Sequence, residues 1–185
     1  MIAGNHEQYG YEKWKNITGY SRQDYYVCDN FLFILLDTFG GNLDPTEFSD
    51  GTYTGADTDY IEELMKRFPR HNVILCAHFF NPDLESERFK SLLRENARIK
   101  CMVCGHNHYT HVNTLGEDFG GKSILYDGNY SYTKAKVITD CMWGFREIII
   151  NGDSVESKYV TPKNRIIIGE NEVVKEYGEQ DFFKI

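Results

Sequence analysis

Three stretches of the chain are continuously apolar, and each has the length of a single strand. They are Phe31–Asp37, Asn72–Ala77 and Ile99–Cys104. Unbroken apolar runs of this length are typical of strands that are covered on both faces. Two amphipathic helices are predicted between them, at Asp57–Phe68 and Ser86–Ala97, because apolar residues recur there at every third or fourth position. This alternation of strand and helix predicts an α/β fold, a layered sandwich of mixed β-sheets flanked by helices.

The pattern changes in the last third of the chain. A short strand is predicted at Ser123–Tyr126, and the strands Gly144–Ile150 and Ser154–Thr161 flank Asn151-Gly152. Asn-Gly between two strands is the strongest short signal for a hairpin, so an antiparallel layer follows the βα part. Residues 162–185 are polar and mixed, and the pattern assigns no element to them. We expect one domain over 1–161 and a C-terminal extension over 162–185.

Composition and charge exclude several classes of protein. The 185 residues are 41% hydrophobic and 26% charged, which is typical of a globular domain. Twenty basic and 28 acidic residues give a net charge of −8, which argues against binding to a nucleic-acid backbone. No apolar run approaches the roughly 20 residues of a membrane span, and the N-terminus has no signal-peptide pattern. We therefore expect a cytoplasmic protein that binds neither nucleic acid nor membrane.

The five cysteines are odd in number and three lie in apolar runs, so we interpret them as reduced, buried thiols. Cys101 and Cys104 have CxxC spacing within a predicted strand. Side chains three positions apart in a strand point to opposite faces, so joint metal binding by this pair is not expected.

Histidine and asparagine side chains gather where predicted strands end. His78 follows the second buried strand, and His106 and His108 follow the third. Asn5 and His6 stand at the end of what would be another strand. Because sites in open α/β sheets form outside the carboxyl ends of the strands, we expect these side chains to converge at one edge. The alternative is that each histidine is a solvated loop residue, which is how we interpret His71.

The segment Gly105-His106-Asn107-His108 carries two imidazoles separated by one residue. In an extended backbone, residues i and i+2 point to the same side, and Gly105 permits a sharp turn before them. One loop can then present one imidazole to each of two adjacent metal ions. Neutral imidazole suits Zn, Mn, Fe, Ni and Co.

The order of these motifs resembles that of a known family. GNHE at 4–7, a lone His78 after an apolar strand, and GHNH at 105–108 are similar to the last three motifs of the calcineurin-like metallophosphoesterases, over residues 1 to about 160. The family's series is DxH, GDxxD, GNH[D/E], a lone His and GHxH. The chain carries neither of the first two motifs, so we expect it to correspond to the C-terminal two-thirds of such an enzyme.

The resemblance implies a chemistry and a role for each matching residue. Two divalent ions (Mn, Fe, Zn or Ni), about 3.5–4 Å apart, would hydrolyse a phosphate ester. His6 would act on the leaving-group oxygen, and Glu7 would orient His6. The metal ligands implied are Asn5, His78 and His106 for one ion and His108 for the other.

The missing motifs would supply every carboxylate ligand. Two dications held only by an amide and three imidazoles would repel each other strongly, so the two-metal centre is not expected on this chain. The remaining arrangement is a single ion bound by Asn5, His78 and His106. We interpret the chain as part of a metal-dependent phosphoesterase with impaired activity. The alternative is a non-catalytic binding or scaffold protein with a vestigial metal site.

The sequence leaves the substrate and the assembly state open. The substrate would be phosphorylated, and phosphoprotein, nucleotide and phospholipid headgroup all fit. The segment after GNHE and the Gly-rich stretch 37–55 are interpreted as loops that line a substrate cleft, with ordinary packing as the alternative.

A homodimer or larger assembly is expected, because loss of N-terminal strands would uncover strand edges and an apolar face. A fold-back of 162–185 is the alternative cover.

Overall fold

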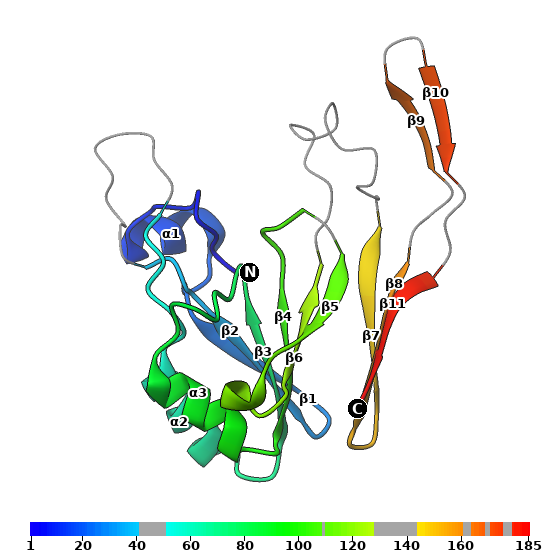
Figure 1. Ribbon diagram of the computed structural model, residues 1–185. Helices are drawn as coiled ribbons and strands as arrows, with labels where there is room; N and C mark the ends of the chain where they lie inside the picture. Colours follow the sequence, from blue (N-terminus) through cyan, green and yellow to red (C-terminus); the bar gives the residue numbers. More distant parts are fainter. Residues whose placement is uncertain (41–50, 109, 128–143, 161–163, 169–170, 176–178) are drawn as a thin grey trace. The chain divides into compact units, whose positions relative to one another are not determined.

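The computed structural model describes residues 1–40, 51–108, 110–127, 144–160, 164–168, 171–175 and 179–185 (Figure 1). The chain divides into two compact units. The first comprises 1–106 and 114–124, and the second comprises 107–113 and 125–185. Each unit is described by itself. The predicted division at residue 161 stays a prediction.

A six-stranded mixed sheet forms the main framework, in the order β1-β2-β3-β4-β6-β5. β2, β3 and β4 are parallel, and β1 is antiparallel to β2. The α/β class is therefore confirmed, and the three apolar runs form the central strands, whose side chains are almost all buried. The bounds are β1 (Asp24–Cys28), β2 (Phe31–Leu36), β3 (Asn72–Ala77), β4 (Ile99–Cys104), β5 (His111–Thr114) and β6 (Ser123–Tyr126).

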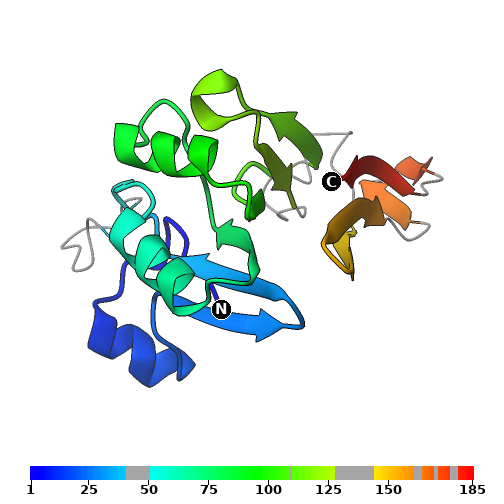
Figure 2. The ribbon, with the colours of Figure 1, turned by 90° about the horizontal axis from the view of Figure 1, so that it is seen from below.

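Helices α2 (Thr58–Arg67) and α3 (Glu87–Glu95) lie next to each other beside the sheet (Figures 1 and 2). Both were predicted, and each begins at a side-chain cap. Asp57 accepts a hydrogen bond from the backbone N–H of Tyr60 at 3.0 Å, and Ser86 accepts one from Phe89 at 3.1 Å. Their apolar faces supply the helical part of the core: Ile61, Leu64, Met65, Phe89, Leu92 and Leu93. The short helix η1 (Glu117–Phe119) follows β5.

One helix lies where the sequence predicted a loop. Tyr11–Thr18 forms α1, so the segment after GNHE is not a loop throughout. Trp14 is the buried residue of α1, and Tyr11 is exposed. The loop predicted at 37–55 falls in part on 41–50, which lie outside the described residues. No helix in the described ranges is long and apolar enough to cross a bilayer.

The second unit contains a three-stranded antiparallel sheet in the order β11-β8-β7, and a separate hairpin of β9 and β10. The predicted hairpin between β7 and β8 is confirmed. Asn151 pairs with Ser154, so the turn falls on Gly152 and Asp153, one position later than predicted, and Gly152 has φ 59°. The bounds are β7 (Phe145–Asn151), β8 (Ser154–Val160), β9 (Asn164–Ile168), β10 (Asn171–Lys175) and β11 (Glu179–Lys184).

Cys28, Cys76, Cys101 and Cys104 are free thiols, and Cys141 lies outside the described residues. The prediction that the cysteines are buried is wrong for Cys28, which is exposed in β1 at the edge of the sheet. Cys28 is exposed, whereas burial raises the pKa of Cys76 and of Cys104 to about 12. The nucleophile in alkylation is the thiolate, and a thiol with a pKa of about 12 is ionised to about one part in 10⁴ at pH 8. Native-state reactivity should therefore differ sharply between these residues.

We expect iodoacetamide at pH 8 to modify Cys28 in the native protein and to leave Cys76 and Cys104 unmodified. Peptide mass spectrometry at successive times measures this difference. In urea all three should react at similar rates. Equal rates in the native protein would show that the buried thiols are accessible and would contradict this assignment.

Candidate metal site

The candidate site lies at the carboxyl edge of β3 and β4. His78 is the first residue after β3, and His106 is the second residue after β4. The two strands are parallel and paired, so they end at the same edge of the sheet. Asn5 comes from the N-terminal segment, which begins next to this edge in Figure 1.

Three of the predicted ligands are brought together here. Asn5 Oδ1 lies 3.0 Å from His78 Nε2, and the same nitrogen lies 3.1 Å from His106 Nδ1. The two imidazole rings are nearly perpendicular, at 82°, with centroids 5.0 Å apart. Asn5 is buried and both imidazoles are half-buried. The amide and the two imidazoles thus converge on one point from three segments far apart in the sequence.

Both contacts lie at hydrogen-bond distance, and which imidazole nitrogen donates depends on the tautomers of His78 and His106. Asn5 Oδ1 can only accept, and Nε2 of His78 carries at most one proton. A protonated His78 Nε2 donates to Asn5 Oδ1, whereas an unprotonated Nε2 accepts from a protonated His106 Nδ1. When neither imidazole nitrogen carries a proton, all three atoms have a lone pair, and lone pairs are what a cation requires.

The separations also fit a metal. Two ligand atoms bound at right angles to an ion about 2.1 Å away lie about 3.0 Å apart. The separations from His78 Nε2 to Asn5 Oδ1 and to His106 Nδ1, 3.0 and 3.1 Å, are close to this value. In the described ranges, no three His, Cys, Asp or Glu side chains gather where they could hold a metal ion. The amide of Asn5 is therefore an essential member of the candidate set, which is electrically neutral when both imidazoles are neutral.

Gly4 makes the close approach of His78 possible. A Cβ at this position would lie 3.0 Å from both Cδ2 and Cε1 of the His78 ring and 2.9 Å from Glu7 Oε2. Glu7 Oε2 accepts a hydrogen bond from the Gly4 backbone at 2.8 Å, which closes a tight turn. His6 is exposed, and its Nε2 lies 3.4 Å from Asn5 Nδ2. The roles of His6 and Glu7 in catalysis stay predictions.

The backbone of the GHNH segment differs from expectation. The prediction of an extended conformation is wrong, because His106 has φ 65° and His108 has φ 57°. Few non-glycine residues adopt this left-handed region, and those that do cluster at functional sites. His108 belongs to the second unit, and its role as a ligand of a second metal stays a prediction.

A buried ion pair next to the site was not predicted. Asp37 directly follows β2, and its Oδ2 accepts from Arg22 Nε at 2.5 Å, with both side chains almost fully buried. Arg22 also donates to the backbone carbonyls of Glu7 and Tyr9, at 2.8 and 2.9 Å. It therefore fastens the N-terminal segment that carries Asn5 to the end of β2. The sequence places Asp37 at the end of a predicted strand, but no pattern in the sequence near Arg22 indicates that it pairs with this carboxylate.

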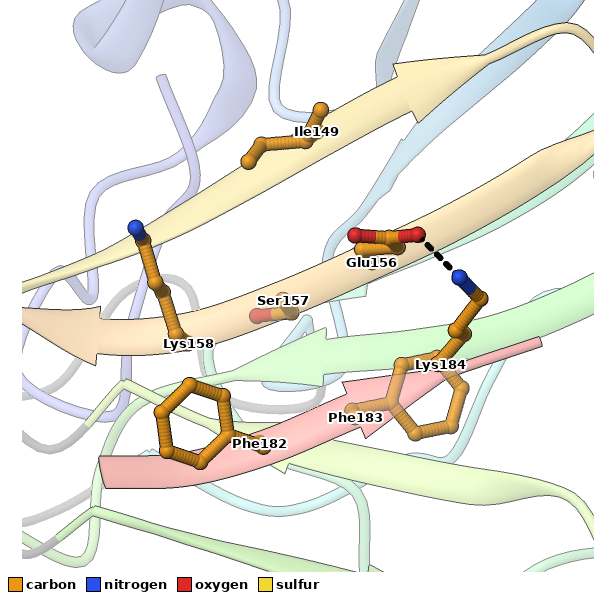
Figure 3. A pocket seen from close by; sticks show the side chains of 7 residues that line it. All are labelled: Ile149, Glu156, Ser157, Lys158, Phe182, Phe183 and Lys184. Carbon is orange, nitrogen blue, oxygen red and sulfur yellow. Dashed lines mark ion pairs between the residues drawn. The ribbon is translucent and has the colours of Figure 1, made fainter. Parts of the chain in front are cut away.

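The second unit contains a cavity of about 440 Å³ on its three-stranded sheet (Figure 3). An ion pair between Lys184 Nζ and Glu156 Oε1, at 2.5 Å, spans β11 and β8 at this cavity. None of the predicted site residues lines it. The lining residues are Ile149, Glu156, Ser157, Lys158, Phe182, Phe183 and Lys184.

Comparisons with known proteins add little to this geometry. No protein-family model matches the chain, and no curated protein matches it. Among solved structures, it is similar to a Vps29 double mutant from Entamoeba histolytica, with a TM-score of 0.33 and 13% sequence identity. The alignment covers 86% of this chain and 63% of that chain, so the chain spans less than two thirds of the Vps29 chain.

Proposed function

We propose that this chain is the metal-binding part of a metallophosphoesterase, in which Asn5, His78 and His106 hold one divalent ion. The observation that supports this proposal is the approach of Asn5 Oδ1 and His106 Nδ1 to the same nitrogen of His78, at 3.0 and 3.1 Å. The order of the GNHE, lone His and GHNH motifs gives the reaction class by resemblance. Mn, Fe, Zn and Ni all accept imidazole nitrogen.

A bound divalent ion would stabilise the negative charge that develops on phosphoryl oxygens. The chain's own residues would protonate the leaving group and hold the ligands in place. His6 is exposed beside Asn5, and in this proposal its imidazole donates a proton to the leaving-group oxygen of the phosphate ester. Asn5 contacts both histidines: its side-chain oxygen lies 3.0 Å from His78 Nε2, and its nitrogen lies 3.4 Å from His6 Nε2. Glu7 fixes the turn that places both residues.

The neutral ligand set limits activity. The sequence contains neither DxH nor GDxxD, so the chain lacks the carboxylates that would balance two dications. We expect one ion per chain and very low turnover of an aryl phosphate with Mn²⁺ or Ni²⁺. The predicted phosphorylated substrate, the homodimer or larger assembly and the cytoplasmic location stay predictions.

Turnover of p-nitrophenyl phosphate, followed with added Mn²⁺, tests the activity. The expected result is a very low metal-dependent rate that His6→Ala abolishes and His71→Ala leaves unchanged. Robust turnover by the unsubstituted chain would show that the missing carboxylates are dispensable. A residual rate that His6→Ala leaves intact would remove His6 from the mechanism.

The missing carboxylates also favour a second candidate function, a non-catalytic binding or scaffold protein with a vestigial metal site. The two candidates differ in one observable. A metal-bound chain with no turnover, even at high enzyme concentration, favours the binding protein, whereas low turnover that depends on His6 favours the phosphoesterase.

A further inference from the structure

Two phenylalanine rings pack against the candidate metal ligands. The Phe79 ring centroid lies 4.6 Å from that of His106. The Phe39 ring lies 5.9 Å from His78 and 6.0 Å from His106, and Phe39 is buried. Aromatic rings at these separations restrict each other's rotation. The orientation of both imidazoles therefore depends on where Phe39 and Phe79 are held.

Tyr53 contacts both phenylalanines edge-on. Its ring centroid lies 5.5 Å from Phe39, at an interplanar angle of 75°, and 5.9 Å from Phe79, at 66°. Its hydroxyl accepts a hydrogen bond from the backbone N–H of Asn81 at 2.9 Å and donates one to Glu85 Oε1. Tyr53 is thus anchored at its hydroxyl and presses with its ring on the two residues that flank the imidazoles.

Glu85 is the anchor of this arrangement. It is 6% exposed, and its second oxygen accepts a hydrogen bond from the backbone of Ala56 at 3.1 Å. Burial raises the pKa of Glu85, while the hydrogen bonds from Tyr53 and Ala56 oppose that rise. Gly55 has φ 82°, and a Cβ there would lie 3.2 Å from Glu85 Oε2, so the loop closes tightly over the carboxylate. A buried carboxylate with partners on both oxygens fixes its neighbours firmly.

The same loops are joined by backbone contacts. Thr38 donates from its hydroxyl to the carbonyl of Phe79 at 2.9 Å, and its own carbonyl accepts from Thr54 N at 2.9 Å. The segments that follow β2 and β3 and the segment that carries Tyr53 therefore form one connected layer over the sheet edge.

We propose that Tyr53 is a positioning residue for the candidate metal site: Glu85 fixes its hydroxyl, and its ring holds Phe39 and Phe79 against His106 and His78. The proposal rests on the proposed function, because it requires the two imidazoles to bind a metal. Groups that orient metal ligands without touching the ion commonly contribute about 10–100-fold to metal affinity. The His106 ring contacts both phenylalanines, with centroids 6.0 Å from Phe39 and 4.6 Å from Phe79.

Binding of Co²⁺ to the full chain tests this role, because the visible absorption of Co²⁺ reports ligand geometry as well as occupancy. Tyr53→Leu should weaken Co²⁺ binding about tenfold and change the absorption spectrum. Tyr53→Phe keeps the ring but loses the hydroxyl that Glu85 and Asn81 hold, so its loss of Co²⁺ affinity should lie between those of the unsubstituted chain and Tyr53→Leu. Tyr25→Leu is the matched control, because Tyr25 packs on Phe68 in the same unit, and this variant should bind Co²⁺ like the unsubstituted chain.

Circular dichroism establishes that each variant is folded. Should Tyr53→Leu fail to fold, the half-exposed Phe79 replaces it as the test, and Phe79→Leu should give the same loss and spectral change. Wild-type affinity and spectrum in folded Tyr53→Leu, or in folded Phe79→Leu where it replaces that variant, would overturn the positioning role alone. Absence of Co²⁺ binding by the unsubstituted chain would overturn the proposed function and this role together.

Discussion

Replacing Arg22 with methionine is expected to lower the free energy of unfolding by about 3–5 kcal/mol, the usual cost of removing one partner of a buried ion pair. Arg22 is 1% exposed and Asp37 is 7% exposed, so the remaining carboxylate would stay buried without its main partner. The carbonyls of Glu7 and Tyr9 would lose their donors at the same time. Urea unfolding followed by tryptophan fluorescence measures the change, since Trp14 lies against the Arg22 guanidinium.

Two further variants separate burial from simple charge removal. Arg88→Met breaks ion pairs with Asp59 and Glu62 at the surface and should leave stability nearly unchanged. The double variant Arg22→Met with Asp37→Leu removes both buried charges and should recover part of the loss. An Arg22→Met loss no larger than that of Arg88→Met would show that the buried pair does not fasten the N-terminal segment.

Replacing His78 with alanine is expected to reduce Mn²⁺ affinity by more than the roughly 10–100-fold that loss of an outer partner costs. His78 Nε2 is the atom that both Asn5 Oδ1 and His106 Nδ1 approach, so its removal leaves the other two ligands without their common neighbour. Isothermal titration calorimetry with Mn²⁺ measures the affinity directly.

His71→Ala is the control for this effect. His71 precedes β3 and His78 follows it, so the six residues of the strand separate the two imidazoles by about 20 Å. His71 packs edge-on against Phe68, at a centroid distance of 5.5 Å. This variant should keep wild-type affinity. A similar loss in both variants would point to adventitious binding of metal by histidines in general.

Much of the framework can be predicted from the sequence, because strands buried on both faces have continuous apolar sequences. β3 and β4 have the predicted bounds, and α2 and α3 differ from theirs by one or two residues. The approach of His78 to His106 follows from the rule that sites form at the carboxyl ends of strands. Asn5 was expected at the end of a strand as well, but in the described residues no strand precedes it, since the first element is α1. The features that could be predicted depend on periodicity and chain direction, which are local properties.

The features that were not predicted depend on partners far away in the chain. Arg22 and Asp37 are 15 positions apart, and Tyr53 and Glu85 are 32 apart, so no local pattern links them. Helix α1 was not predicted because it is short and polar, with Trp14 as its buried residue. The sequence feature that indicates it is Gly19, which ends the helix with a φ of 78°. The left-handed backbone of His106 was missed because glycine is the usual residue in that region.

The measurement that tests the metal site most directly is a crystal structure of the chain soaked with Mn²⁺ or Zn²⁺, with anomalous diffraction recorded at the metal edge. The site geometry predicts a single anomalous peak about 2.0–2.2 Å from Asn5 Oδ1, His78 Nε2 and His106 Nδ1. A map with no peak at these three atoms, or with metal bound only at other histidines, would contradict it.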